Sequence, residues 1–365
     1  MSDVSDTPAS RPGGRSRSGR RTLLFAASVV VALLAAEAAA RLFHWGPPAY
    51  TPPRIETPGG VPFLRFGDGF FMYQPNCVFS CAYDPAGDAR GYFGATGRIV
   101  YTINAYGMRG PAVTIEKAPN TLRVVCLGDS FTFGEGVYYP DTYPAQLENR
   151  LSTAYPARRV EVLNAGVQAY GTREEVRFFL TRCAGFHPDI VTLGFFLNDA
   201  TPIAETIRDH QAITRSADLS RLGRLSRLWA VLERRRHASR IQEDYFRTTR
   251  RSFDSTTWND CRDLLKGMQL VSKEYHFRFL VVIFPMLWQL DDTYPFTDLH
   301  ARIVGACRAA GCEVLDLLDT YRGRRAETLW VHPTDQHPND LAHRLAAEQI
   351  AARLTAGRAD RADGS

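Results

Sequence analysis

Four short clusters of polar residues, far apart in the chain, carry side chains from which a serine-based active site could be built. The first is a Gly-Asp-Ser motif that ends at Ser130, and the second ends at Gly166. The third contains Asn198, and the last holds Asp335 and His337. A serine hydroxyl is a weak nucleophile at neutral pH and needs a positioned base, usually a histidine oriented by a carboxylate. We therefore consider Ser130 as nucleophile, His337 as its base and Asp335 as the partner of that base.

Attack of a hydroxyl group on an ester carbonyl also produces an oxyanion. Backbone N–H groups and amide side chains aimed at that charge are each worth roughly 3 to 4 kcal/mol. The N–H of Ser130, the N–H of Gly166 and the side chain of Asn198 are suitable donors. Chemistry of this kind requires no cofactor and no metal ion.

The elements that must position these residues follow from the apolar pattern. From Thr121 onward, apolar runs of strand length alternate with amphipathic segments, which is typical of a parallel sheet covered on both faces. We predict an α/β fold with a three-layer, doubly wound, flavodoxin-like sheet of five strands. The five runs are LRVVCLG from Leu122, RVEVLNAG from Arg159, DIVTLGFF from Asp189, RFLVVIFP from Arg278 and CEVLDLL from Cys312. Functional groups of such sheets gather beyond the carboxyl ends of the strands, so we expect all four clusters at one edge.

The segment TREEVRFFLTRC, residues 172–183, is predicted to be one of the covering helices. Thr172 and Glu175 have the spacing of a capping box at its start. Phe179 and Leu180 are expected on its apolar face.

A Gly-Asp-Ser tripeptide alone does not establish a catalytic serine, because it should occur by chance in roughly one chain in ten of this length. A serine in a turn is the simpler interpretation. The preceding apolar strand and the three further clusters favour the catalytic one. The Gly-x-Ser-x-Gly motif of the α/β-hydrolase nucleophile elbow fits this sequence less well, because Thr132 occupies the position of the motif's second glycine. No Gly-Lys-Ser/Thr follows Gly136, as a phosphate loop would need.

The partner residues have simpler interpretations as well. Gly166 could merely end a strand, and Asn198 could cap the following segment. His332, Asp335 and His337 have side chains that bind metal ions, but a fourth ligand is missing and Ser130 would have no role.

In order and in type, Ser130, Gly166, Asn198 and His337 resemble the four blocks of the SGNH or GDSL hydrolase family. The stretches YTINAYGMRGP, GDSFTFGEGV and HPNDLAHRLAAE resemble its membrane-anchored bacterial members. The resemblance covers roughly residues 100 to 355 and is interrupted by one long insertion. It implies that the serine is the nucleophile and the histidine the base, and that the glycine and the asparagine complete the oxyanion hole.

The carboxylate departs from the usual pattern of that family. It commonly precedes the histidine by three residues, where this chain has Thr334, whereas Asp335 lies only two residues before His337. Carbohydrate O-acetylation proteins are among the relatives with the shorter spacing. We therefore expect a serine-dependent carboxylic ester hydrolase that acts outside the cytoplasm through an acyl-enzyme, on a small-molecule or glycan ester. The alternatives are an O-acyltransferase for envelope or exported polysaccharide and a non-catalytic SGNH fold that binds envelope components.

The N-terminal region has the features of a membrane anchor. Residues 1–21 contain five arginines among Ser, Gly and Pro, which predicts a disordered cytoplasmic tail. Residues 22–41 are predicted to form a transmembrane anchor or signal segment; the apolar stretch 22–40 would span roughly 28 Å as a helix, close to the thickness of a bilayer core. By the positive-inside rule the rest of the chain lies outside the cytoplasm. Glu37 should lie near the interface and reach Arg41 on the next turn.

Cleavage of the N-terminal segment is the alternative to an anchor. Small residues at positions 38–40 would suit a signal peptidase, and Arg20-Arg21 loosely resembles a twin-arginine signal. The net charge of +5 is small for 365 residues and no basic stripe contains interleaved aromatics, so we expect no nucleic-acid partner.

The remaining divisions follow from composition. Residues 42–120, rich in Pro, Gly and aromatics, are predicted to form a membrane-proximal strand-and-loop segment, and residues 121–355 the SGNH domain. Residues 201–260 are a helical insertion, and 356–365 a flexible tail. In the insertion, an apolar helix face is formed by Leu219, Leu222, Leu225, Trp229 and Leu232. We expect it to pack over the core, the alternative being a lid or a membrane-surface contact.

Seven scattered cysteines match neither a dense disulfide scaffold nor a paired zinc motif. Cys77 and Cys81 are close enough in sequence to pair, as are Cys307 and Cys312. Cys126 lies in an apolar strand and is expected to be a small buried hydrophobe. The pattern leaves the disulfide pairing and the oligomeric state open.

Overall fold

The computed structural model describes residues 17–43, 51–208 and 220–356. The chain forms two compact units. The first comprises residues 1–48 and 218–239, and the second comprises residues 49–217 and 240–365.

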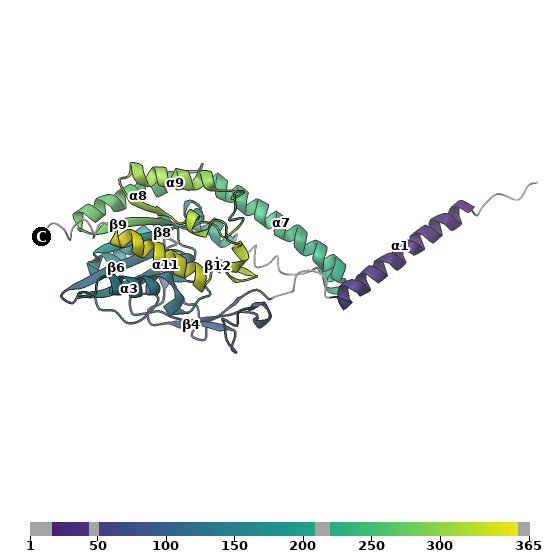
Figure 1. The fold of residues 1–365 in the computed structure, drawn as a ribbon, viewed down its shortest axis with the longest axis horizontal. Coiled ribbons are helices and arrows are strands. Elements are labelled where there is room, and N and C mark those ends of the chain that lie inside the picture. Colours follow the sequence, from purple (N-terminus) through teal and green to yellow (C-terminus); the bar gives the residue numbers. More distant parts are fainter. Residues whose placement is uncertain (1–16, 44–50, 209–219, 357–365) are drawn as a thin grey trace, which may run out of the picture. The chain divides into compact units, whose positions relative to one another are not determined.

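The second unit is built on a five-stranded parallel sheet (Figure 1). Its strands are β6 (Thr121–Gly128), β7 (Arg159–Gly166), β8 (Ile190–Phe195), β9 (Arg278–Ile283) and β10 (Glu313–Asp316). Their spatial order is β10-β9-β8-β6-β7, which is the doubly wound, flavodoxin-like order. The five predicted strands and the predicted fold class are thus confirmed. In the ladders, Gly128 pairs with both Gly166 and Gly194, so three neighbouring strands end at the same level.

Helices cover both faces of this sheet. On one side α3 (Tyr143–Ala154) packs against β7 and against α11 (Asp340–Thr355). On the other side α8 (Thr256–Glu274) packs against α4 (Thr172–Phe178), against α9 (Thr297–Ala309) and against β9. Every residue of β6 is buried between these layers, which explains its uninterrupted apolar run.

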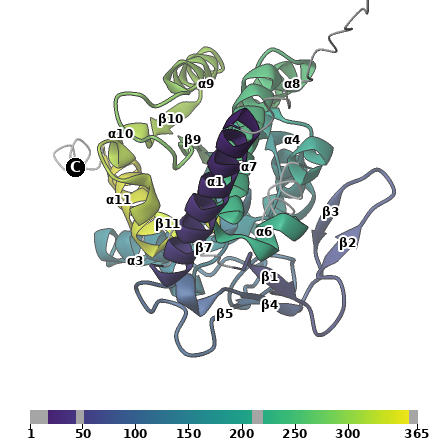
Figure 2. The ribbon, with the colours of Figure 1, turned by 90° about the vertical axis from the view of Figure 1, so that its right-hand side faces the viewer.

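Residues 51–120 add small antiparallel sheets to the same unit. One consists of β1 (Arg54–Glu56), β4 (Val78–Ala82) and β5 (Arg98–Thr102), and a hairpin of β2 (Phe63–Arg65) and β3 (Phe71–Tyr73) lies beside it in Figure 2. Aromatic side chains join these strands to the central sheet. The rings of Tyr73 and Tyr101 lie 4.9 and 5.1 Å from the ring of Phe133, which follows β6.

The start of α4 differs from the prediction by one residue. Gly171 is the N-cap, and its N–H donates to the Glu174 side chain at 3.4 Å. Thr172 instead donates its hydroxyl to Asp199 Oδ2 at 2.9 Å. The prediction that Leu180 belongs to the buried face is also wrong, because residues 179–183 form a wider π-helical turn and Leu180 is 51% exposed.

The first unit contains α1 (Arg17–Leu42), of which Gly19–Leu42 is long and apolar enough to cross a membrane. A signal sequence would meet the same criterion. Glu37 accepts a hydrogen bond from Arg41 Nε at 2.7 Å, as predicted. It also accepts the N–H groups of Arg227 and Leu228, at 2.7 and 3.1 Å, at the start of α7 (Arg227–Ser252). The carboxylate thus caps a second helix as well as pairing with an arginine.

The insertion is helical where it is described, as α6 (Arg221–Leu225), α7 and α8. Leu219 lies outside the described residues. The other four members of the predicted apolar face, Leu222, Leu225, Trp229 and Leu232, are 40 to 72% exposed. All seven cysteines lie in the described part of the chain and are free thiols, and Cys126 is buried as expected.

Glu175 on α4 is a buried carboxyl group without a hydrogen-bond partner among the described residues. The side chain is 1% exposed. Burial raises its pKa well above the ordinary value, and the neighbouring carboxylates of Asp199 and Asp129 add to this effect. Glu175 is therefore protonated in the folded chain at a pH where the unfolded chain has lost the proton.

We expect Glu175→Gln to remove a pH-dependent loss of stability. A raised carboxyl pKa lowers the free energy of unfolding as pH rises above the unfolded value, by up to about 1.4 kcal/mol per pH unit. The variant should match the wild type near pH 4.5 and exceed it increasingly toward pH 8. Urea unfolding of the full chain in detergent across this range measures the difference. The exposed Glu274→Gln is the control, and parallel pH profiles for Glu175→Gln and wild type would contradict the assignment.

Candidate active site

Ser130 is positioned by the two residues before it. Gly128 ends β6 with a φ of 153°, and a Cβ atom there would lie 2.0 Å from Thr132 Oγ1. Asp129 caps the short helix α2 (Ser130–Phe133), since its Oδ1 accepts the N–H of Phe131 at 2.8 Å. Ser130 is therefore the first residue of a helix at the carboxyl end of a central strand, which explains the Gly-Asp-Ser sequence.

The structure brings Ser130, His337 and Asp335 together. Ser130 Oγ lies 2.9 Å from His337 Nε2, although 207 positions separate the two residues. His337 Nδ1 lies 2.5 Å from Asp335 Oδ1. The three side chains thus form one hydrogen-bonded row from hydroxyl to imidazole to carboxylate.

The two-residue spacing of the carboxylate has a simple origin. Asp335 and His337 lie on β12 (Asp335–Pro338), which pairs with β11 (Trp330–His332), and alternate residues of a strand point to the same side. Asp335 Oδ1 also accepts the N–H of His337 at 3.1 Å. His332 does not join this row, because its ring contacts Thr334 Oγ1 at 2.7 Å and the Asp84 carbonyl at 3.1 Å. The metal cluster considered from the sequence therefore does not assemble.

A tyrosine that the sequence did not indicate completes the environment of Asp335. Tyr83 donates its hydroxyl to Asp335 Oδ2 at 2.8 Å, and it is 4% exposed. Its ring stacks on Phe93 at 4.4 Å. Residues 51–120 thus contribute directly to the site, through a contact across 252 positions that no local pattern reveals.

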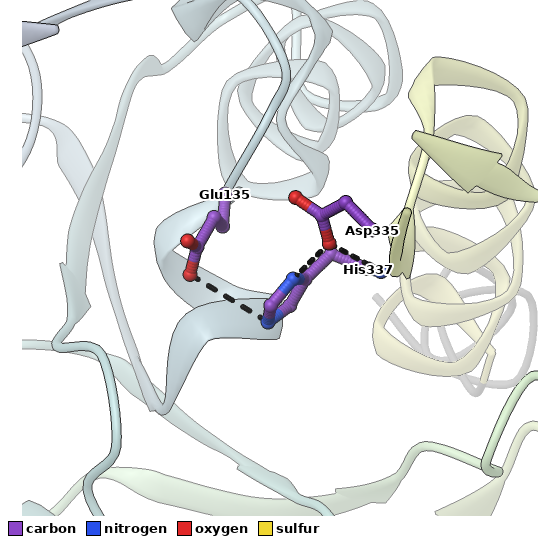
Figure 3. Close-up of side chains that lie close together, drawn as sticks. All are labelled: Glu135, Asp335 and His337. Carbon is purple, nitrogen blue, oxygen red and sulfur yellow. Dashed lines mark hydrogen bonds and ion pairs between the residues drawn. The ribbon is translucent and has the colours of Figure 1, made fainter. Parts of the chain in front are cut away.

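Glu135, which no sequence motif considered above indicated, is a second carboxylate at the same imidazole. Its Oε2 lies 3.6 Å from His337 Nε2 and its side chain is 9% exposed. Figure 3 shows Glu135 and Asp335 at different ends of the His337 ring. Its signal in the sequence is the Gly-Glu-Gly of GDSFTFGEGV, in which Gly134 and Gly136 have φ values of 82° and 78°. Glycine is favoured at such angles, so this turn is built to a specific shape.

The turn that carries Glu135 is held by the buried Arg109. One guanidinium nitrogen, Nη1, donates to the carbonyls of Phe133 and Gly134 at 2.7 and 2.5 Å, and Nη2 donates to the carbonyl of Val137 at 2.6 Å. Arg109 is 2% exposed and belongs to the YTINAYGMRGP stretch. That stretch therefore holds the backbone of the turn that follows Ser130, residues 133–137.

Charge around His337 favours its protonated form. Burial alone would lower the pKa of His337, but the charges of Asp335 and Glu135 and the hydrogen bond to Asp335 raise it well above its usual range. Burial likewise opposes ionisation of Asp335, yet His337 and the hydrogen bonds around it hold the pKa of that carboxyl below its usual value. These charges therefore stabilise the imidazolium that forms when neutral His337 accepts a proton.

The three expected oxyanion donors lie at the same edge of the sheet. The Ser130 N–H is at the first position of α2, where helical N–H groups have no intrahelical partner. Asn198 lies in a short turn (Leu197–Ala200) after β8, with its Oδ1 buried and without a partner among the described residues. The Gly166 N–H donates to Asn164 Oδ1 at 3.1 Å, so an oxyanion would have to share it. Gly166 also has a steric role, since a Cβ atom there would lie 2.2 Å from the Phe133 nitrogen.

Glu135, Asp335 and His337 also satisfy the residue types of a metal site, with one donor atom of each within 4.8 Å of the others. Both ring nitrogens of His337 are already engaged, Nδ1 by Asp335 at 2.5 Å and Nε2 by Ser130 at 2.9 Å. A metal ion on Nε2 would displace the serine. The geometry therefore fits proton transfer better than metal binding.

Solved structures that resemble this chain include three of low sequence identity. The acetylxylan esterase Axe2 from Geobacillus stearothermophilus is 14% identical, with 64% of this chain and 94% of that chain covered and a TM-score of 0.41. TesA is 15% identical, with 64% and 97% covered and a TM-score of 0.40. A two-domain esterase active on acetylated mannans is 16% identical, with 64% of this chain covered and a TM-score of 0.39. This chain spans about half of the length of that esterase, 49%.

No curated protein matches the sequence. The model of the GDSL-like lipase/acylhydrolase family matches residues 126–345, which begin within β6 and end within α11. This range contains Ser130, Gly166, Asn198, Asp335 and His337. The chain therefore belongs to the GDSL-like lipase/acylhydrolase family and is a hydrolase of ester bonds.

Proposed function

We propose that this ester hydrolase is serine-dependent and works through an acyl-enzyme intermediate. The observation that carries the proposal is the row from Ser130 Oγ through His337 to Asp335, with separations of 2.9 and 2.5 Å. Each member has the chemistry that its place requires: a hydroxyl to attack, an imidazole to accept the proton, and a carboxylate to orient the ring.

In the first half-reaction Ser130 Oγ attacks the ester carbonyl carbon, and its proton passes to His337 Nε2. The tetrahedral oxyanion is stabilised by the Ser130 N–H, the Asn198 amide and the Gly166 N–H. The bond to the alcohol then breaks, and His337 returns the proton to the leaving oxygen. In the second half-reaction water attacks the acyl group, releases the acid and restores the Ser130 hydroxyl. Asp335 orients the ring and stabilises the imidazolium in both steps.

We further propose that α1 anchors the chain in a membrane. We also propose that the second unit, which contains Ser130, Asp335 and His337 and is called the catalytic unit below, lies outside the cytoplasm. The apolar stretch Gly19–Leu42 supports the anchor, and the arginines that precede it support the orientation. The substrate class is then a small-molecule or glycan ester that is accessible outside the cytoplasm. Nucleic acid is not among the proposed partners.

Ser130→Ala should abolish turnover while the fold persists. Removal of the nucleophile lowers the rate of hydrolysis of p-nitrophenyl acetate by at least about 10³-fold and removes covalent labelling by a fluorophosphonate. The exposed Ser152→Ala is the matched control and should behave as wild type. Labelling that persists in Ser130→Ala would remove the nucleophile assignment.

Tyr83→Phe should weaken catalysis without unfolding the chain. Loss of the 2.8 Å hydrogen bond leaves Asp335 Oδ2 without its donor, which raises the pKa of that carboxyl and loosens the orientation of His337. Because hydrogen bonds to charged groups contribute about 1.5 to 3 kcal/mol, we expect kcat/KM to fall about tenfold or more. Tyr92→Phe is the control, since Tyr92 bonds to Asp141 outside the row. Equal kcat/KM in Tyr83→Phe and wild type would exclude this role.

The anchor predicts that the full chain, expressed in a Gram-negative host, sediments with membranes after a high-salt wash and dissolves only in detergent. Protease added to spheroplasts should digest the catalytic unit. Release by salt alone, or a mature N-terminus near residue 40, would contradict an uncleaved anchor.

A further inference from the structure

The carboxylate of Glu135 has no role in the mechanism proposed above, yet it faces the atom that transfers the proton. Its Oε2 lies 3.6 Å from His337 Nε2, on the side chain of a residue that is 7% exposed. Among the described residues, the ion pair with His337 is the contact observed for this carboxylate, and no protein hydrogen bond to it is seen. Its oxygens are therefore available to accept a hydrogen bond from a group outside the protein that binds beside Nε2.

The backbone around Glu135 is fixed from several directions. Arg109 holds the carbonyls of Phe133, Gly134 and Val137. On the other side of Glu135, the N–H of Gly136 donates to Tyr101 Oη at 2.9 Å. A Cβ atom on Gly136 would lie 2.3 Å from Val331 Cγ1, so the turn is also closely packed. Glu135 is thus presented to His337 by a rigid support.

The chemistry of the second half-reaction identifies the missing partner. Once Ser130 Oγ is acylated it carries no proton, and His337 Nε2 accepts a hydrogen bond from the incoming nucleophile instead. Because Nε2 and Glu135 Oε2 are 3.6 Å apart, one oxygen atom can lie within hydrogen-bonding distance of both. Water has two O–H bonds and can donate one to each acceptor. A simple alcohol has only one O–H bond. When it donates that bond to Nε2, its oxygen faces the carboxylate of Glu135 with no hydrogen to donate to it.

We propose that Glu135 positions the attacking water and thereby selects water over simple alcohols as acyl acceptor; this rests on the proposed acyl-enzyme function. The water oxygen forms the new bond to the acyl carbon, and one of its protons passes to His337 Nε2. The other O–H group donates a hydrogen bond to Glu135, and its proton remains on the acid product. The bond from Ser130 Oγ to the acyl carbon breaks, and the proton on Nε2 returns to Oγ. Glu135 therefore accepts a hydrogen bond but no proton.

The same geometry makes a distinction among alcohols. A vicinal diol can donate a hydrogen bond from one hydroxyl to His337 Nε2 and a second hydrogen bond from the adjacent hydroxyl to Glu135. Ethylene glycol should therefore compete with water for the acyl-enzyme better than 2-methoxyethanol does, although the two are similar in size. This preference connects the site to sugar hydroxyls, which commonly occur as neighbouring pairs.

The test is the partition of the acyl group between acceptors. The full chain in detergent hydrolyses p-nitrophenyl acetate in the presence of ethylene glycol or 2-methoxyethanol, and NMR measures acetate against alkyl acetate. For Glu135→Gln and Glu135→Ala we expect the ratio of 2-methoxyethyl acetate to acetate to rise about tenfold, the loss of one charged hydrogen bond. The advantage of ethylene glycol should disappear in Glu135→Ala.

The partition ratio does not depend on the rate of acylation or on the fraction of folded enzyme, so a merely structural role of Glu135 would leave it unchanged. Tyr83→Phe is the matched control, because it should slow turnover without moving the ratio. Unchanged or lowered ratios in both Glu135 variants would overturn the proposal. Absence of turnover and of Ser130 labelling in the wild type would instead overturn the acyl-enzyme function on which it rests.

Discussion

The buried guanidinium of Arg109 holds together the turn that follows Ser130. Burial opposes the charge of this side chain, which is 2% exposed. Three main-chain carbonyls accept from Nη1 and Nη2 and the faces of two aromatic rings contact the cation, whereas Nε has no partner among the described residues. Its Cζ lies 4.7 Å from the Tyr101 ring centroid and 4.9 Å from that of Phe133. The positive charge also lies at the carboxyl end of α2, where it stabilises the helix that begins at Ser130. Both Ser130 and Glu135 therefore depend on one side chain.

The residues that provide this support precede the parallel sheet in the chain. Tyr83, Tyr101 and Arg109 all come from the strand-and-loop region, and they contact Asp335, Gly136 and the turn around Glu135. This region therefore acts as the scaffold of the site as much as the central sheet does. Shortening this region would remove hydrogen bonds both from Asp335 and from the turn that follows Ser130.

What the sequence could predict was governed by local rules. Apolar runs revealed the five strands, and the rule that side chains gather beyond strand ends brought Ser130 to His337. Tyr83 could not be found this way, because its contact with Asp335 depends on packing between distant segments. The exposure of Leu180 was missed because a π-helical turn breaks the 3.6-residue period on which the prediction relied. Gly166 was noticed for its N–H, whereas its close approach to Phe133 is visible only in three dimensions.

The position of a second carboxylate at His337 cannot be explained by basicity alone. Each increment in the pKa of a general base strengthens its affinity for the proton, but once that pKa exceeds the working pH the neutral fraction falls in proportion. Asp335 and its hydrogen bond already favour the imidazolium, so the added charge of Glu135 yields little further gain in proton transfer. A buried carboxylate that adds little to the base, yet lies beside Nε2, is placed to act on a group that approaches that atom. The reacting oxygen of the acyl acceptor is the group that passes through that position.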